Sequence, residues 1–325
     1  MAKKYGHFIK KFEITSTPEG LYNTPRFWKQ GPDMEGFNAH LSYGFFKEPA
    51  VCHPVDDSKA LVHPYDECLV FVGNEPDNIF HLGGKISIEL GEEREVHTFT
   101  EPSVVCVPKG TPHGPVKILE ADTPIIHYHF GLDPIYKAEI VTHKAQSPAS
   151  GDRYEHLVKK MITSQLDPSG QGSAGALVPG KPPVLGADGV MRPALAGVGP
   201  GNGDAIVWLY GSDLEGFNVN FTWGFYSTLG KWHRSGEIHT HPEAEILVFV
   251  GLNPDKMDYL GCEVEMGFGK EAERHVLNEP GLMIAPEGFP HLPMITRWCD
   301  KPYGFFVLCL SGDHASPWVE VEEDD

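Results

Sequence analysis

The chain has 325 residues, of which 41% are hydrophobic and 22% are charged, a composition typical of a soluble protein with about two domains. Its net charge of −19 argues against nucleic acid and anionic membranes as partners, because both bind clustered Lys and Arg, but it is compatible with a small-molecule substrate. No apolar run reaches the roughly 18 residues that span a bilayer, and no secretory signal is visible. We therefore expect a cytoplasmic protein whose six cysteines are reduced.

Residues 1–25 are expected to form an N-terminal extension. Its stretch 8–14 is apolar, and together with a predicted helix between the repeats described next it provides material for strand exchange or for a dimer surface. We therefore expect a homo-oligomer.

The chain contains a duplication, in which residues 26–132 are repeated as residues 206–312. EGFNAHLSYGFF at 35–46 matches EGFNVNFTWGFY at 215–226 with an offset of 180 residues, and HPYDECLVFVG at 63–73 matches HPEAEILVFVG at 241–251 with an offset of 178. The change of offset falls in the loop between the two matches, where a change of length is tolerated. Each copy consists of short β-branched and aromatic runs separated by Gly/Pro turns, which predicts an all-β sandwich or barrel.

Residues 133–205 are expected to link the two copies. DRYEHLVKKMITSQ at 152–165 combines a capping-box-like start with one apolar stripe, so the pattern predicts a helix that packs against a barrel or a partner chain. Residues 167–203 are rich in Gly, Pro, Ala and Ser without periodicity, which is typical of a linker or a surface loop. Residues 313–325, with the sequence PWVEVEEDD at their end, are expected to form a solvated acidic tail.

The second copy contains a set of metal-ligating residue types. In HTHPEAEILVFVG, His239 and His241 share one face of an extended strand, and Glu245 begins the next strand, so two adjacent strands would point all three inward. GLMIAPEGFPH predicts a tight turn followed by a fourth ligand, His291. Such a set suits one divalent ion of Mn, Fe, Co, Ni, Cu or Zn and leaves coordination positions open for catalysis. Without a metal, these residues would form a hydrogen-bonded polar network or lie exposed at a barrel mouth.

The same two stretches resemble the motifs of a known family. HTHPEAEILVFVG resembles the first cupin motif, HxHxxxE followed by an apolar strand and Gly, and GLMIAPEGFPH resembles the second, GxxxxPxGxxH. Because the chain contains two copies of this domain, it resembles a bicupin. The resemblance implies a double-stranded β-helix barrel, or jelly roll, in each copy and a metal held by His239, His241, Glu245 and His291.

The first copy departs from this pattern. The residues that keep their places are His63, Glu67 and His113. Leu61 stands at the position that corresponds to His239, so the motif of the first copy is expected to be degenerate. The remaining triad could hold a metal more weakly, or it could be a relic satisfied by hydrogen bonds. His127 and His129 could supply a replacement ligand, although a role in the core is the simpler interpretation.

Further candidates for catalysis or substrate binding lie ahead of the metal-ligating stretch. They are Trp223 on a predicted strand and His233 and Arg234 in the following loop. A loop histidine or arginine could orient a carboxylate or move a proton, and the alternatives are core packing for the tryptophan and a surface loop for the other two. His233 corresponds to His53 of the first copy. His97 and His275 occupy matching places in both copies, which favours a shared structural hydrogen bond.

These features favour a metal-dependent enzyme acting on a small molecule, with its active site in the second copy. Oxygenase or oxidase chemistry at an iron or manganese ion is the first expectation, and a redox-neutral lyase, decarboxylase or isomerase is the alternative, because the ligands do not separate the two. A non-catalytic binding, storage or regulatory protein is the second hypothesis. The expected cofactor is one divalent transition-metal ion per chain.

Overall fold

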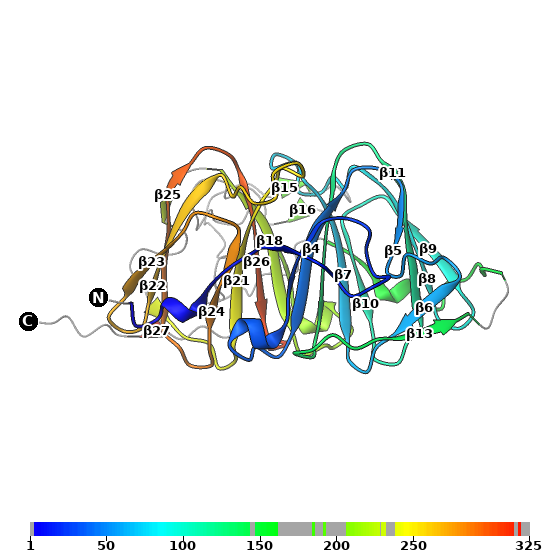
Figure 1. Ribbon diagram of the computed structural model, residues 1–325, viewed down its shortest axis with the longest axis horizontal. Helices are drawn as coiled ribbons and strands as arrows, with labels where there is room; N and C mark the ends of the chain where they lie inside the picture. Colours follow the sequence, from blue (N-terminus) through cyan, green and yellow to red (C-terminus); the bar gives the residue numbers. More distant parts are fainter. Residues whose placement is uncertain are drawn as a thin grey trace, which may run out of the picture. The chain divides into compact units, whose positions relative to one another are not determined.

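The computed structural model of the chain divides into two compact units, of which unit 1 comprises residues 1–12 and 162–325 and unit 2 comprises residues 13–161 (Figure 1). The residues that the structure describes are 3–143, 147–161, 184–185, 191–192, 206–227, 229–231, 238–314 and 318–319. Within them, strands predominate and the helices are four short 3-10 turns, so the fold class is all-β as predicted. Of the helices in these residues, none has the length and apolar character needed to cross a membrane.

Unit 2 is built from two antiparallel sheets. The first has the order β14-β10-β7-β12-β4-β3-β2, and the second has the order β13-β6-β11-β8-β9 with β5 also paired to β11. The elements of unit 2 are β2 (Ile14–Thr15), β3 (Arg26–Lys29), η2 (Gly31–Met34), β4 (His40–Phe46), β5 (Ala50–Cys52), β6 (Lys59–Val62), β7 (Glu67–Gly73), β8 (Gly84–Leu90), β9 (Glu95–Phe99), β10 (Ser103–Val107), β11 (His113–Ala121), β12 (Ile125–Gly131), β13 (Glu139–Thr142), η3 (Glu155–Leu157) and β14 (Val158–Lys160). The two sheets close around an apolar core that includes Leu69, Phe71, Ile88 and Val105.

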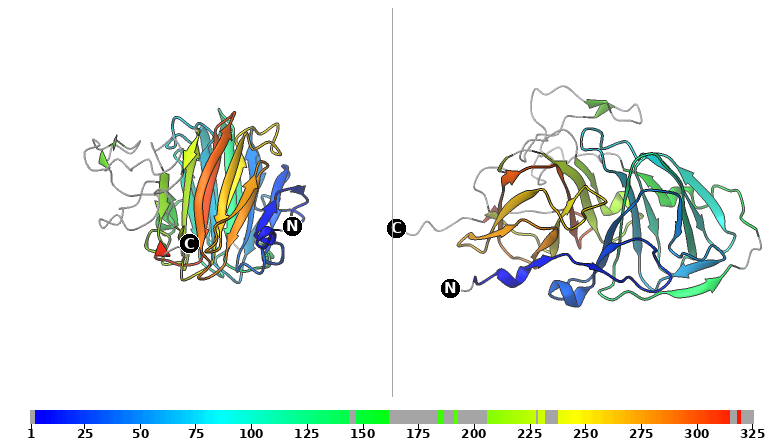
Figure 2. Two further views of the ribbon diagram at one scale, coloured as in Figure 1. Left: turned by 90° about the vertical axis from the view of Figure 1, so that its left-hand side faces the viewer. Right: turned by 45° about the horizontal axis from the view of Figure 1, so that its top comes forward.

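Unit 1 repeats this plan. Its sheets have the orders β1-β24-β21-β26-β18-β17 and β23-β22-β25-β20-β27, and β19 also pairs with β25. The elements of unit 1 are η1 (Gly6–Phe8), β1 (Ile9–Lys11), β15 (Val184–Leu185), β16 (Met191–Arg192), β17 (Ile206–Leu209), η4 (Gly211–Asp213), β18 (Asn220–Tyr226), β19 (Gly230–Lys231), β20 (Ile238–His239), β21 (Glu245–Gly251), β22 (Cys262–Phe268), β23 (Glu273–Leu277), β24 (Gly281–Ala285), β25 (His291–Cys299), β26 (Tyr303–Cys309) and β27 (Trp318–Val319). Figure 2 shows the strands of each unit curving into a barrel, which is the jelly-roll fold that the resemblance implies.

Each unit takes one edge strand from the segment that precedes the other repeat. Strand β1 pairs with β24 of unit 1, and β14 pairs with β10 of unit 2. The two segments are similar in sequence, YGHFIKKF at 5–12 and YEHLVKKM at 154–161. The prediction of a helix over 152–165 is therefore wrong where the segment is described, because pairing with the open edge of β10 outweighs a weak helical preference. Residues 162–165 lie outside the described residues, and a homo-oligomer stays a prediction.

The same polar contacts hold both exchanged strands. Glu273 accepts from the backbone N–H of Tyr5 at 3.0 Å and lies 2.7 Å from Nε2 of His275. Glu95 accepts from the backbone N–H of Tyr154 at 3.1 Å and lies 2.8 Å from Nε2 of a histidine in the matching place, His97. The two histidines of the repeat therefore have a common structural role, as their occurrence in both copies suggests.

These strand pairings predict which unit is destabilised by a mutation in each of the two segments. Phe8 packs against Phe289 of unit 1 at a ring distance of 5.0 Å, and the corresponding Leu157 is buried in the core of unit 2. We expect Phe8→Ala to cost about 2 kcal/mol of stability and to speed hydrogen exchange in β24, whereas Leu157→Ala speeds exchange in β10. Mass spectrometry of amide exchange measures both. If both variants speeded hydrogen exchange in the same unit, the pairing of β1 with unit 1 and of β14 with unit 2 would be contradicted.

The end of the chain also differs from its prediction. Trp318–Val319 forms β27, which pairs with β20, so this part of the expected acidic tail belongs to a sheet of unit 1. By pairing with β20, β27 provides hydrogen-bond partners for the backbone N–H and C=O groups on one side of that strand. Residues 320–325 lie outside the part of the chain that the structure describes.

Candidate metal centres

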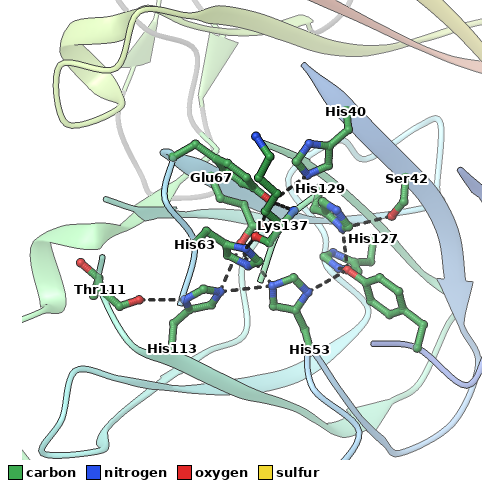
Figure 3. A network of polar contacts seen from close by, with 12 residues as sticks. His40, Ser42, His53, His63, Glu67, Thr111, His113, His127, His129 and Lys137 are labelled. Atoms are coloured by element: carbon green, nitrogen blue, oxygen red, sulfur yellow. Dashed lines mark hydrogen bonds and ion pairs between the residues drawn. The ribbon is translucent and has the colours of Figure 1, made fainter. Parts of the chain in front are cut away.

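Unit 2 gathers four side chains that can hold a metal ion. His53, His63, Glu67 and His113 each place one ligand atom within 4.8 Å of the others, and all four are buried (Figure 3). Glu67 and His113 begin β7 and β11, whereas His63 follows β6 and His53 follows β5. Glu67 shares a face of β7 with the core residue Leu69, so the alternation of side chains points its carboxylate into the barrel. Its Oε2 atom lies 3.2 Å from Nε2 of His53 and of His113, and 3.5 Å from Nε2 of His63.

A fourth residue therefore joins the three that the degenerate motif of the first copy retains. Leu61 does occupy the predicted place, because it lies opposite His113 in the register as His239 lies opposite His291. The fourth residue is His53, which reaches the centre because β5 also pairs with β11. Its backbone φ of +51° is uncommon for a residue other than glycine, and such conformations are concentrated at functional sites.

Gly114 makes room for His53. A Cβ atom built at Gly114 would lie 2.0 Å from the backbone oxygen of His53, so any side chain there displaces the loop that carries this ligand. We expect Gly114→Ala to lower the affinity of unit 2 for a metal by roughly 10- to 100-fold, measured by competition with a chelator. Gly110→Ala is the matched control, since Gly110 also has a positive φ, of +78°, but a Cβ atom built there would meet nothing within 4 Å. Equal losses in the two variants would mean that backbone strain, and not the position of His53, sets the affinity.

The outer ring nitrogens of two ligands fix their protonation. Nδ1 of His63 lies 2.6 Å from the carbonyl oxygen of Lys137, and Nδ1 of His113 lies 3.0 Å from that of Thr111. A carbonyl oxygen only accepts hydrogen bonds, so each Nδ1 carries the proton of the neutral ring. Each Nε2 atom then presents a lone pair to the centre, which is the arrangement of histidines that bind metals.

The charges of the side chains in this centre favour the binding of a cation. Burial lowers the pKa of His53 to about 4 and also lowers that of His63, so both rings are neutral near pH 7. Burial alone would raise the pKa of Glu67, and positive charge at the adjacent His63 and His53 is what holds it well below its usual value, a charge that an ion between neutral rings would supply. A charged carboxylate oxygen thus faces imidazole lone pairs with few protons between them, an arrangement that is unfavourable unless a positive ion lies there.

The distances between the donor atoms fit a transition-metal ion. Donors bound at roughly 2.1 Å to one ion lie about 3.0 Å apart in octahedral coordination and about 3.4 Å apart in tetrahedral coordination. The contacts of Glu67 Oε2, at 3.2, 3.2 and 3.5 Å, fall close to this range. The residues therefore fit a first-row divalent ion by both spacing and donor type.

Unit 1 contains the set that the motifs predict. His239, His241, Glu245 and His291 are all buried, and the three imidazoles converge on one point. Nε2 of His241 lies 3.0 Å from Nε2 of His239 and 3.3 Å from Oε2 of Glu245, which lies 3.1 Å from Nε2 of His291. His291 donates through Nδ1 to the carbonyl oxygen of Phe289 at 3.0 Å, so its Nε2 presents a lone pair inward.

Comparison with known structures identifies the fold. Oxalate decarboxylase from Bacillus subtilis, in a structure at pH 4.6, matches with a TM-score of 0.55 and 11% identity over 95% of this chain and 78% of the other. A deletion mutant of the same enzyme matches with a TM-score of 0.54 and 10% identity over 95% of this chain and 79% of the other. The chain has a bicupin fold. No protein-family model matches the chain, and no curated protein is similar to it in sequence.

The barrel of unit 1 has a cavity beside its candidate metal centre. It is lined by Trp208, Thr222, His239, His241, Glu245, Leu247, His291, Leu292, Val307 and His314. His314 was not predicted as a site residue, because the sequence pattern places it in the solvated tail. A ligand atom of His314 lies within 4.8 Å of those of His241 and Glu245, and its ring stacks edge-on against Trp208 at 4.7 Å. No spacing rule relates His314 to the motifs, because it is brought back by the loop that follows β26.

The structure describes one of the three other residues predicted for catalysis or substrate binding, Trp223. Trp223 is fully buried against Phe225 at a ring distance of 5.1 Å, so core packing, the alternative interpretation, describes it. Its neighbour Thr222 points to the other face of β18 and lines the cavity. His233 and Arg234 lie outside the described residues, and their roles stay predictions.

Proposed function

We propose that this protein is a metal-dependent enzyme that cleaves a carbon–carbon bond of a small carboxylate substrate without net oxidation, at the centre of unit 1. The observation that carries the proposal is the cavity there, which all four predicted ligands line. A pocket of unit 2 is lined by only one of the four ligand-type residues of that unit, His63. A substrate in the unit 1 cavity would therefore reach a bound ion directly.

Two buried donors in the cavity favour a substrate with acceptor oxygens. Trp208 and Thr222 both line it, and neither Nε1 of the tryptophan nor Oγ1 of the threonine has a hydrogen-bond partner within the described part of the chain. Buried polar atoms of this kind normally find a partner, which a substrate carboxylate supplies. Leu247, Leu292 and Val307 form apolar walls beside these donors, as is usual in sites for small molecules.

His314 is placed to move a proton in this cavity. Its ring centroid lies 4.7 Å from that of His241, so it borders the metal centre without completing the predicted ligand set. Glu245, as a ligand, is less available as a base. A bound divalent ion would supply Lewis acidity toward a substrate oxygen, and His314 would hold or deliver a proton at the carbon or oxygen that changes charge.

The structural comparisons favour the redox-neutral alternative over oxygenase chemistry. The two structures compared above are oxalate decarboxylases, although at this identity the likeness concerns the fold. Both chemistries need open coordination positions, so the ligand set supports each equally. The reaction class rests on this analogy together with the acceptor-oxygen chemistry of the cavity.

Turnover with and without oxygen tests the proposal. The full chain, purified without chelator and analysed for metals, is incubated with oxalate and with a panel of small dicarboxylates under nitrogen and under air. We expect carbon dioxide and a product shorter by one carbon, with no net consumption of oxygen. Stoichiometric consumption of oxygen would favour the oxygenase expectation, and a metal-loaded protein that binds these acids without turning them over would favour the binding-protein hypothesis.

A further inference from the structure

A second group of ligand-type residues lies against the metal centre of unit 2 and shares Glu67 with it. Ligand atoms of His40, Glu67 and His129 lie within 4.8 Å of one another, and all three side chains are buried (Figure 3). His129 is one of the two late-strand histidines for which the sequence allowed either a ligand or a core role. The other, His127, makes contacts of a different kind that are described below.

The two oxygens of Glu67 face different neighbours. Oε2 contacts the imidazoles of the first centre, whereas Oε1 has no hydrogen-bond partner among the residues described. Nε2 of His129 also has none there. Neither residue has any exposed surface, so these two atoms are buried polar groups that require a partner.

Gly131 gives the ring of His40 its place beside Glu67. In the sheet, Gly131 lies between the two residues, opposite His40 of β4 on one side and opposite Glu67 of β7 on the other. A Cβ atom built at Gly131 would lie 2.7 Å from Nε2 of His40. The missing side chain therefore lets the imidazole lean across the strand toward the carboxylate.

The protonation of His40 leaves a lone pair on its inner nitrogen. Its Nδ1 lies 2.8 Å from the carbonyl oxygen of Asp133, which only accepts, so Nδ1 carries the proton of the neutral ring. Nε2 then faces inward as an acceptor. Tyr65 lies 3.5 Å from this nitrogen, but its hydroxyl donates to the carbonyl oxygen of Lys137 at 3.1 Å.

A chain of hydrogen bonds through Tyr22 assigns the same state to His129. His127 donates through Nδ1 to the carbonyl oxygen of Val70 at 2.9 Å, so its Nε2 accepts the single hydroxyl proton of Tyr22 at 3.0 Å. The Tyr22 oxygen then accepts from Nδ1 of His129 at 2.6 Å, which is the shorter of the two polar contacts of that nitrogen. His129 therefore also presents a lone pair inward, beside that of His40.

We propose that unit 2 binds a second divalent transition-metal ion through His40, His129 and Oε1 of Glu67, with Glu67 bridging it to an ion in the first centre. Two histidines and one carboxylate form a ligand set with open positions, and paired metals in proteins lie about 3.5–4 Å apart, the span of a bridging carboxylate.

Unit 1 provides an internal comparison. Its residues at the positions of His40, His129 and Gly131 are Asn220, Val307 and Cys309, as the matching strand registers show. Valine cannot bind a metal and instead forms a wall of the cavity. The second ion is therefore a property of unit 2 alone, and it does not depend on the reaction proposed for unit 1.

Metal stoichiometry tests the inference. The metal-free full chain is loaded with manganese(II) chloride, freed of excess metal and analysed for bound manganese. We expect about three ions per chain, one in unit 1 and two in unit 2, and about two after His40→Phe or His129→Phe. His97→Phe is the matched control, because His97 is a buried histidine of unit 2 that contacts Glu95 and belongs to neither group of ligand residues, and it should keep three. A count of two for all three variants would attribute the loss to damaged packing and overturn the inference.

Electron paramagnetic resonance of the unaltered protein gives an independent test that needs no variant to fold. A bridged pair of manganese(II) ions gives an exchange-coupled spectrum, which we expect in the native chain and not after His40→Phe. Two ions per chain with only isolated-ion spectra would overturn the second ion while keeping both main centres. An absence of any bound manganese would overturn this inference and the metal basis of the proposed function together.

Discussion

Alanine at His291 is expected to abolish turnover, whereas the same change at the equivalent His113 leaves most of it in place. His291 lines the cavity of unit 1 and lies 3.1 Å from the carboxylate of Glu245, so its loss would open a bound ion to water and would remove one of the four predicted ligands. His113 belongs to unit 2 and does not line that cavity. We expect a loss of more than about a hundredfold in kcat/KM for His291→Ala and of less than about fivefold for His113→Ala.

The measurement pairs activity with metal content and folding. Both variants should bind less metal than the native chain, and both should keep the far-ultraviolet circular dichroism of a β-protein. His275→Gln controls for the loss of any buried histidine in unit 1, because His275 contacts Glu273 and not the cavity. The reverse pattern, with turnover lost in His113→Ala and kept in His291→Ala, would move the active site to unit 2.

Local sequence patterns were enough to predict that four ligand-type side chains of unit 1 lie close together. Period-two alternation places His239 and His241 on one face and Glu245 on the inward face of the next strand, and a glycine turn delivers His291. The histidine that takes the place of the one missing at position 61 could not be found in this way. His53 lies eight residues earlier and enters from another strand that pairs with β11, a relation that only the register reveals.

The helix predicted over 152–165 was wrong for a related reason. The apolar positions of this segment fit a helical stripe, and nothing within it indicates that an open sheet edge lies beside it. The similarity between YGHFIKKF and YEHLVKKM was the available signal, because two copies of one segment are expected to have one structure. His314 gave no local signal at all, since its place depends on how the chain returns after β26.

The two barrels have the same strand arrangement but differ in the residues that fill their interiors. Where unit 2 has His129 and His40, unit 1 has Val307 and Asn220, so unit 2 fills its interior with imidazoles and unit 1 leaves a cavity. The same backbone thus holds a centre beside a small cavity in one unit and a centre beside further ligand-type residues in the other.

The metal-free protein is expected to lose stability steeply between pH 7 and pH 5, and unit 2 should unfold first. Burial lowers the pKa of His53 to about 4 and places those of His127 and His129 well below the ordinary value of 6.5. Between about pH 4 and 6.5 the unfolded chain therefore binds more protons than the folded chain, so the free energy of unfolding falls as the pH falls. Each of these histidines contributes about 2 kcal/mol between pH 7 and pH 5, and three contribute about 6 kcal/mol, comparable to the whole stability of a domain.

Urea unfolding with a chelator present measures this dependence, and amide exchange in β12 assigns it to unit 2. The low pKa of Glu67 does not contribute here, because a carboxyl group with a depressed pKa loses its stabilising effect only below about pH 4.5. His127→Phe keeps an aromatic ring stacked on Phe71 and should remove about one third of the pH dependence. A free energy of unfolding that stays constant from pH 7 to pH 5 would mean that the buried imidazoles already carry protons in the folded chain. The lone pairs on which both metal centres of unit 2 depend would then not exist.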